Sequence, residues 1–180
     1  KVIMAMTLIT TNTSSGAASS SFTSSIDSTY PLYIFKFYDV NPATNSVQFS
    51  FQGNASSQSG YNETMTTTFF RSYHAEDDSG TSLGYETGYD QAQGTSFQTI
   101  VGQQGNGGDE SCAGTLWLFN PSNTTYVKHF YARTQEYFEG THSMDNYIAG
   151  YFNVTAAITN IQFKMSSGNM DGVIKMYGVG

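Results

Sequence analysis

Alternation of apolar and polar side chains is the feature that most constrains how this chain can fold. Val47, Phe49 and Phe51 alternate with three polar residues, and this period of two places one set of side chains on each face of a β-strand. Residues 32–38 are apolar at almost every position, as in a strand that is covered on both faces. Further strand patterns occupy residues 64–73, 97–101, 114–119, 125–137, 145–155, 158–166 and 172–177.

Turn-forming residues separate these strands. Residues 39–45 and residues 120–123 each contain an Asn-Pro pair, and residues 166–169 read Ser-Ser-Gly-Asn. Strands spaced by roughly 8–12 residues, with turn residues between them, are typical of β-sandwiches and barrels. No segment keeps a convincing helical period. We therefore predict an all-β fold, an antiparallel β-sandwich of the jelly-roll type.

The length of 180 residues is typical of one domain. Residues 11–21 are polar, rich in Ser and of low complexity, which predicts a flexible connection. We divide the chain accordingly into an N-terminal strand or arm with its linker, residues 1–21, and a β-sandwich domain, residues 22–180. An arm of this kind is expected to reach a neighbouring protein by strand addition.

The charged residues are few and do not cluster. They make up 12% of the chain, aromatic residues make up 15%, and the formal net charge is −7. Seven dispersed basic residues do not form a groove for phosphates, so nucleic acid is excluded as a partner. No apolar run approaches the roughly 18 residues of a membrane span, so a membrane partner is excluded too. A surface poor in Lys and Glu but rich in Thr and Tyr favours protein contacts.

The reactive side chains show no catalytic pattern. Cys112 lies before an apolar strand, where we expect a small buried side chain, and a catalytic thiol would need a nearby base that the sequence does not supply. His74, His129 and His142 belong to no recognisable motif, and we interpret them as surface or interface residues. We therefore expect no enzyme, no catalytic residues and no cofactor.

The acidic residues of two loops raise the question of a metal. Asp77, Asp78, Asp109 and Glu110 have the hard oxygen ligands that Ca²⁺ prefers, but their spacing differs from that of an EF-hand. The favoured interpretation is that these side chains are solvated loop acids, so no metal site is predicted. A pair of carboxylates for glycoside hydrolysis is likewise not evident in the sequence.

The aromatic residues offer two alternatives, core filling and a platform on which sugars stack. Because most of them alternate within strands, we assign the aromatic residues of the C-terminal half mainly to the core. They are Trp117, Phe119, Tyr126, Phe130, Tyr131, Tyr137 and Phe138. The loop residues Tyr61, Tyr85 and Tyr89 are harder to bury, and we predict that they contact a neighbouring subunit or a glycan.

Several segments together resemble a family of small structural proteins of tailed bacteriophages, particularly marine ones. The resemblance spans nearly the whole chain from Met4 and leaves residues 1–3 outside the usual pattern. Because the chain begins with Lys1 and has Met at positions 4 and 6, Met4 or Met6 is an alternative start. The segments are residues 26–37 (IDSTYPLYIFKF), 41–44 (NPAT), 114–122 (GTLWLFNPS), 147–152 (YIAGYF), 163–169 (FKMSSGN) and 172–179 (GVIKMYGV). The resemblance implies a virion component with a jelly-roll-like sandwich, and it implies no catalytic residues.

The leading hypothesis is therefore a virion structural protein. We expect a decoration or cement protein on a capsid, or another accessory subunit, whose partners are the major capsid protein, tail components or copies of itself. The alternative is a tail or fibre domain that binds a host surface glycan.

Overall fold

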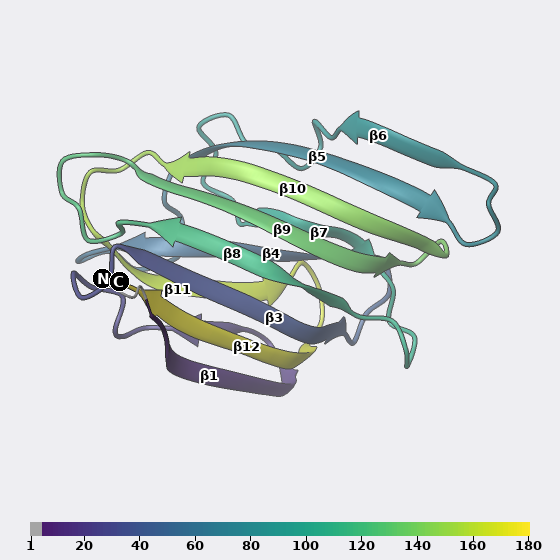
Figure 1. Ribbon diagram of the computed structural model, residues 1–180, viewed down its shortest axis with the longest axis horizontal. Helices are drawn as coiled ribbons and strands as arrows, with labels where there is room; N and C mark the ends of the chain where they lie inside the picture. Colours follow the sequence, from purple (N-terminus) through teal and green to yellow (C-terminus); the bar gives the residue numbers. More distant parts are fainter. Residues whose placement is uncertain (1–4) are drawn as a thin grey trace.

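The computed structural model describes residues 5–180, and these residues form twelve β-strands and no α-helix (Figure 1). The all-β prediction is thereby confirmed, while the alternative start at Met4 lies outside the described residues. The strands are β1 (Met6–Ala17), β2 (Ser20–Phe22), β3 (Leu32–Pro42), β4 (Val47–Ala55), β5 (Met65–Ala75), β6 (Thr81–Tyr85), β7 (Gln98–Gln104), β8 (Cys112–Phe119), β9 (Lys128–Phe138), β10 (His142–Phe152), β11 (Ile158–Met165) and β12 (Met170–Val179).

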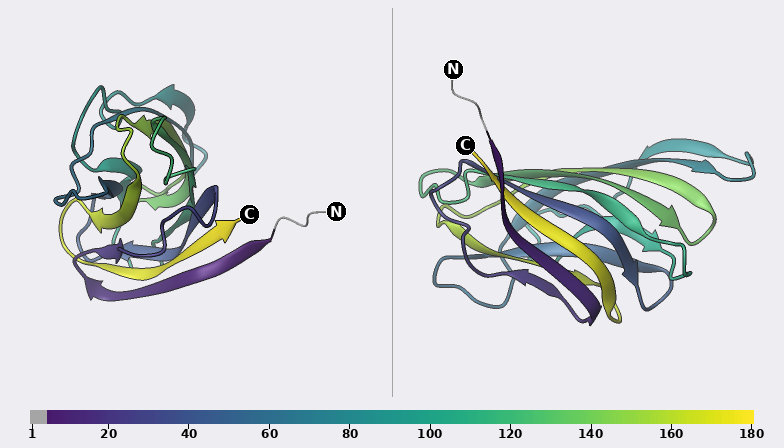
Figure 2. Two further views of the ribbon diagram at one scale, coloured as in Figure 1. Left: turned by 90° about the vertical axis from the view of Figure 1, so that its left-hand side faces the viewer. Right: turned by 60° about the horizontal axis from the view of Figure 1, so that its bottom comes forward.

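The strands form two antiparallel layers that pack face to face (Figure 2). The larger layer has the order β1-β12-β3-β8-β9-β10-β5-β6, and the smaller one has the order β2-β11-β4-β7. The layers are joined along one side where Gln104 of β7 pairs with Phe138 of β9. The antiparallel sandwich predicted from alternation and turn spacing is the observed architecture.

The pairing follows the jelly-roll scheme. Strands β1, β2, β3 and β4 pair with β12, β11, β8 and β7 respectively, so the first half of the chain runs antiparallel to the second half as one long ribbon. Folding of this ribbon places β12 beside β3 and β11 beside β4, which produces the two sheets.

Four further strands enlarge the first sheet. Strands β9 and β10 lie in the chain between β8 and β11, and β5 and β6 lie between β4 and β7. They continue the sheet outward from β8, and the β5–β6 hairpin extends beyond the smaller sheet (Figures 1 and 2). This extension gives the larger sheet an outer face much wider than the jelly-roll core alone would provide.

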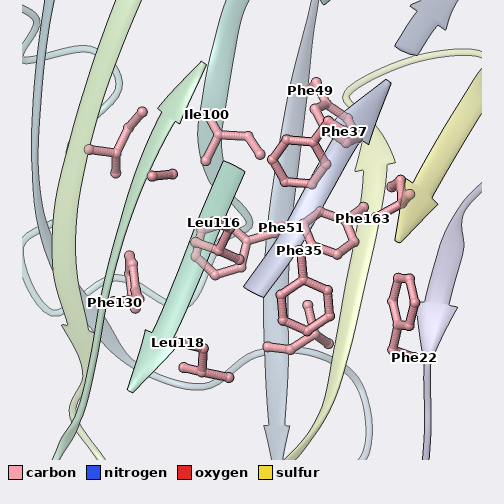
Figure 3. Packing of buried hydrophobic residues seen from close by; sticks show 14 of the residues in the cluster. Phe22, Phe35, Phe37, Phe49, Phe51, Ile100, Leu116, Leu118, Phe130 and Phe163 are labelled. Carbon is pink, nitrogen blue, oxygen red and sulfur yellow. The ribbon is translucent and has the colours of Figure 1, made fainter. Parts of the chain in front are cut away.

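The core lies between the two sheets and is rich in phenylalanine. Phe163 of β11 is fully buried at its centre, with ring centroids 5.2 Å from Phe37, 5.5 Å from Phe35 and 5.9 Å from Phe49 (Figure 3). Edge-to-face and offset contacts of this kind add to the free energy gained by removing each ring from water.

The N-terminal region differs from its prediction. Residues 11–17 continue β1, which pairs with β12 of the same chain, and β2 begins at Ser20. The polar Ser and Thr side chains suggested a linker, but an edge strand with solvent on one side tolerates such residues because its backbone still pairs with its neighbour. An arm made of residues 6–17 would have to leave this sheet to reach another protein.

The region 74–108, in which residues 97–101 were the predicted strand, contains more regular structure than predicted. Strand β6 pairs with β5 although all five of its residues are exposed, and β7 extends to Gln104. The exposed β6 lacks the one-sided apolar pattern that identifies a half-buried strand, so alternation alone missed it.

Candidate functional site

The outer face of the smaller sheet is polar and is covered by the chain's own loops. The Gln52 side chain of β4 is fully buried, and its Nε2 donates to the backbone oxygens of Glu63, Thr95 and Ser96 at 3.0–3.2 Å. On β11, Gln162 Nε2 donates to Ser21 Oγ at 2.9 Å. We call this surface the polar face; its hydrogen-bonding groups are satisfied largely within the chain.

The outer face of the larger sheet is apolar where β1, β12 and β3 lie near Met6 and Val179, and we call the outward side chains there the apolar half of this face. Further along the same strands, Lys175 of β12 and Lys36 of β3 lie opposite each other on this face. Leu8 lies opposite Tyr177, which lies opposite Ile34, and Leu8 remains 51% exposed. The members of the apolar half are Met6, Leu8, Leu32, Ile34, Tyr177 and Val179.

The same row of side chains continues across the other half of the face, on β8, β9, β10 and β5, which we call the grooved half. Trp117 lies opposite Ile34 and beside Tyr131, with ring centroids 5.0 Å apart. Across from Tyr131 the next two strands carry only Ala149 and Thr68. Two small side chains beside large aromatic ones leave a gap in the surface.

A series of depressions occupies this half. The depression between His129 and Tyr131 has a volume of about 420 Å³, and the depression between Tyr131 and Arg133 has a volume of about 350 Å³. Ala149 lines both of them. Phe70 and Tyr147 line the second depression, and their rings are parallel within 3° with centroids 4.9 Å apart.

The grooved half contains an ion pair between Arg133 and Asp145, whose charges neutralise each other. Arg133 Nε and Nη2 donate to the two carboxylate oxygens of Asp145 at 3.0 and 2.6 Å, and Tyr147 Oη donates to Asp145 Oδ2 at 2.8 Å. The hydrogen bond from Arg133 is the main cause that lowers the pKa of Asp145, so the carboxylate stays ionised at neutral pH. The Arg133 guanidinium also lies 4.9 Å from the Tyr147 ring centroid, which holds both side chains in place.

A buried lysine fixes the loops at the end of the groove. Lys128 at the start of β9 is fully buried, and its Nζ donates to the backbone oxygens of Tyr126, Val154 and Thr155 at 2.6–3.2 Å. Burial lowers the pKa of this ammonium group. These hydrogen bonds hold the exposed Tyr126 ring at the rim of a further depression at the loop end, of about 550 Å³, that His129 also lines.

The inner side of the same sheet carries a buried carboxyl group whose pKa is raised. Glu136 is fully buried, and its Oε1 accepts hydrogen bonds from Gly102 N and Asn146 Nδ2, both at 3.2 Å. Desolvation raises the pKa of Glu136. Among the described residues, Glu136 Oε2 and Asn146 Oδ1 have no hydrogen-bond partner. Complete burial keeps this carboxyl group out of contact with solvent.

The other reactive residues do not form a common site. Cys112 is buried as predicted, and burial raises the pKa of its thiol well above the usual value. Within residues 5–180, no three His, Cys, Asp or Glu side chains lie close enough together to hold a metal ion. Asp77 instead accepts a hydrogen bond from Ser79 N, and Glu110 accepts one from Gly107 N.

The three loop tyrosines of the sequence prediction lie in different environments. Tyr89 packs partly buried against Phe69, with ring centroids 5.1 Å apart. Tyr61 is half-buried near Phe97. Tyr85 ends β6 opposite Phe70, is 51% exposed and donates to Asp90 at 2.7 Å. Of the three, Tyr85 is the one that adjoins the outer face of the larger sheet.

The assignment of the C-terminal aromatic residues mainly to the core was wrong. Of the seven, Phe130 is buried, whereas Trp117, Phe119 and Tyr131 point to the opposite side of the sheet, and Tyr126 lies exposed in a loop. Alternation placed these residues on two faces but did not say that the outer face would also be aromatic. The opposed residues Phe70, Tyr147 and Ala149 were missed, because their proximity depends on strand pairing.

Comparison with known proteins leaves this surface as the main guide to function. No model of a known protein family matches the sequence, and no curated protein is similar to it. No helix within the described part of the chain is long and apolar enough to cross a membrane.

Proposed function

We propose that this chain is a non-enzymatic structural protein of a phage particle, held in the virion by contacts of its apolar half with particle proteins or with copies of itself. The observation that carries the proposal is the difference between the two outer faces. The resemblance of the sequence to phage structural proteins supplies the setting, and the burial of Glu136 and Cys112 supports the absence of catalysis.

The energetics favour a partner on the apolar half. Apolar surface gains about 25 cal/mol for each Å² removed from water, and contiguous exposed apolar patches mark interaction surfaces in soluble proteins. Leu8 and Met6 are each about half exposed at one edge of the sheet, where a neighbouring protein can cover them. Repeated contacts in a symmetric particle add up even where each single contact is weak. A decoration or cement role uses this property directly.

The deciding experiment is a cryo-electron microscopy reconstruction of purified particles of the phage that encodes the chain. We expect density for the jelly roll with the apolar half against another protein subunit. Absence of the chain from purified particles, as judged by mass spectrometry, would reject the virion assignment.

A point substitution tests the apolar half separately. Leu8→Ser should weaken incorporation or self-association by about tenfold, because interface anchors contribute at least about 1–2 kcal/mol. It should leave the free energy of unfolding within about 0.5 kcal/mol, because Leu8 is exposed in the single chain. The matched control is Asn160→Ser on the polar face. Equal incorporation of both variants would contradict a contact through the apolar half.

The second candidate function, glycan recognition by a tail or fibre domain, depends on a different part of the molecule. The grooved half has aromatic walls with a few polar groups, a composition typical of ligand sites.

A further inference from the structure

The depressions of the grooved half lie in a row along β9, which we call the track, and neighbouring depressions share a lining residue. The depression at the loop end shares His129 with the next, which shares Tyr131 with the third, which shares Arg133 with the fourth. The fourth reaches Gln135. Alternate residues of a strand lie on one face, so this track follows the outward side chains of β9 over about 20 Å, at about 3.4 Å per residue. A linear ligand fits such a shape better than a compact one.

The walls and floor of the track suit flat, partly apolar rings. Trp117 and Tyr131 lie on the β9 side of Ala149. Phe70 of β5 lines the same depression and stacks on Tyr147, which follows Ala149 at a spacing of two residues on β10. Aromatic faces carry partial negative charge, and the axial C–H bonds of a pyranose ring present partial positive charge, so the two stack. The hydroxyl groups of such a ring point sideways, towards side chains such as Thr66, which also lines the track.

The charge of the track selects among linear ligands. Across the four depressions the acidic and basic lining residues are Arg133, Asp145 and His129. Arg133 and Asp145 neutralise each other through two hydrogen bonds. A polyanion would meet no unpaired cation of Lys or Arg type in this lining, so charge complementarity favours a neutral ligand.

A peptide is disfavoured because the track lies on a sheet face. Strand β9 already pairs with β8 and β10 on its two sides, so it offers no free edge for strand addition. A peptide on this face would leave backbone N–H and C=O groups unpaired against aromatic rings, which costs free energy. The apolar face of a sugar ring presents C–H groups, so no hydrogen-bonding group is left unpaired against the aromatic rings.

We propose that the track along β9, centred on Tyr131 and Ala149, binds a neutral oligosaccharide. This inference deepens the second candidate function and is independent of protein contacts through the apolar half. The exposed rings of Tyr131 and Phe70 stack on sugar rings, and the polar side chains at the margins exchange hydrogen bonds with their hydroxyl groups.

The test is a binding screen of the full chain against immobilised neutral oligosaccharides, with acidic oligosaccharides such as alginate fragments in parallel, followed by calorimetry on any ligand found. We expect saturable binding to at least one neutral glycan. Ala149→Phe fills the gap without removing any contact residue and should reduce affinity at least tenfold, and Tyr131→Ala should do the same.

The matched control is Tyr38→Ala, which removes an aromatic side chain, 40% exposed, from β3 and outside the track. It should leave affinity unchanged within about twofold. Circular dichroism and thermal melting establish that each variant is folded. Binding to acidic glycans alone, no binding at all, or undiminished binding by Ala149→Phe would overturn the proposal. Because Leu8→Ser should bind the glycan normally, failure of the glycan proposal and failure of the particle-contact proposal are separable.

Discussion

The two outer faces of the sandwich differ in how their side chains are covered. On the polar face, buried amides such as Gln52 bind the backbone of loops that fold over them. On the outer face of the larger sheet, Leu8, Trp117 and Tyr131 lie in one cross-strand row with no loop above Leu8 or Tyr131, which stay about half exposed. The hydrogen-bonding groups of the polar face are satisfied within the chain, whereas the outer face of the larger sheet keeps apolar surface that a partner can cover.

The difference between the two faces indicates which surface of a charge-poor protein is available for interaction. Few charged residues suggested an interactive surface over the whole molecule, but the polar face uses its Gln and Asn side chains internally. The exposed apolar surface is concentrated on the larger sheet. The inserted strands β5, β6, β9 and β10 enlarge that sheet. Three sets of measurements test this contrast.

The largest effect is expected in the core beneath both faces. Phe163→Ala should lower the free energy of unfolding by about 3–5 kcal/mol, because it removes a fully buried ring and leaves a cavity among other rings. Gln162→Ala, one residue away on the polar face, should cost about 1 kcal/mol or less. Urea denaturation measures both. Similar losses for the two variants would mean that inward and outward positions on β11 are not distinct.

An intermediate effect is expected where the polar face is covered. Gln52→Ala should cost about 1–3 kcal/mol, since three loop carbonyl groups lose their donor in a buried place. Limited proteolysis should show faster cleavage in residues 58–64 and 91–97. Tyr131→Ala in the grooved half should lower the free energy of unfolding by about 1 kcal/mol and leave proteolysis unchanged. If Tyr131→Ala lowers the free energy of unfolding more than Gln52→Ala does, the grooved half stabilises the fold and is not a free surface.

The smallest effect concerns pH and the inner side of β9. Burial raises the pKa of Glu136 above its unfolded value of about 4.3, so the folded protein holds this proton more tightly than the unfolded chain. The resulting stability is complete below the unfolded pKa and is lost as pH rises through the folded pKa. Glu136→Gln stays neutral and retains an oxygen for Gly102 N and Asn146 Nδ2.

The variant should therefore gain stability relative to the natural protein as pH rises from about 4 towards neutral. Urea denaturation of both proteins at several pH values measures this difference. If the two stability curves stay parallel across that range, ionisation of Glu136 does not destabilise the folded protein.

Alternation and turn chemistry allowed much of the fold to be predicted, and specific residues show why. Phe49 and Phe51 face the core as their period required, and the turn at residues 166–169 contains Gly168 with a φ of 72°, a conformation that glycine adopts readily. Strands β1 and β6 were shortened or missed because they are sheet edges, where solvent-exposed residues carry little pattern. Of the candidate site, Trp117 and Tyr131 were noticed as a potential platform but were assigned to the core.

The sequence by itself determined which side chains share a face, because successive side chains of a strand point to opposite faces and this period of two is local. It also determined where the chain turns. Only the tertiary structure decided which face is inside and which strands are neighbours. Ala149 meets Tyr131 through pairing of β10 with β9, and Thr68 joins them through β5, from a distant part of the chain. Those juxtapositions depend on long-range hydrogen bonding between strands, which no local pattern encodes, and they create the groove.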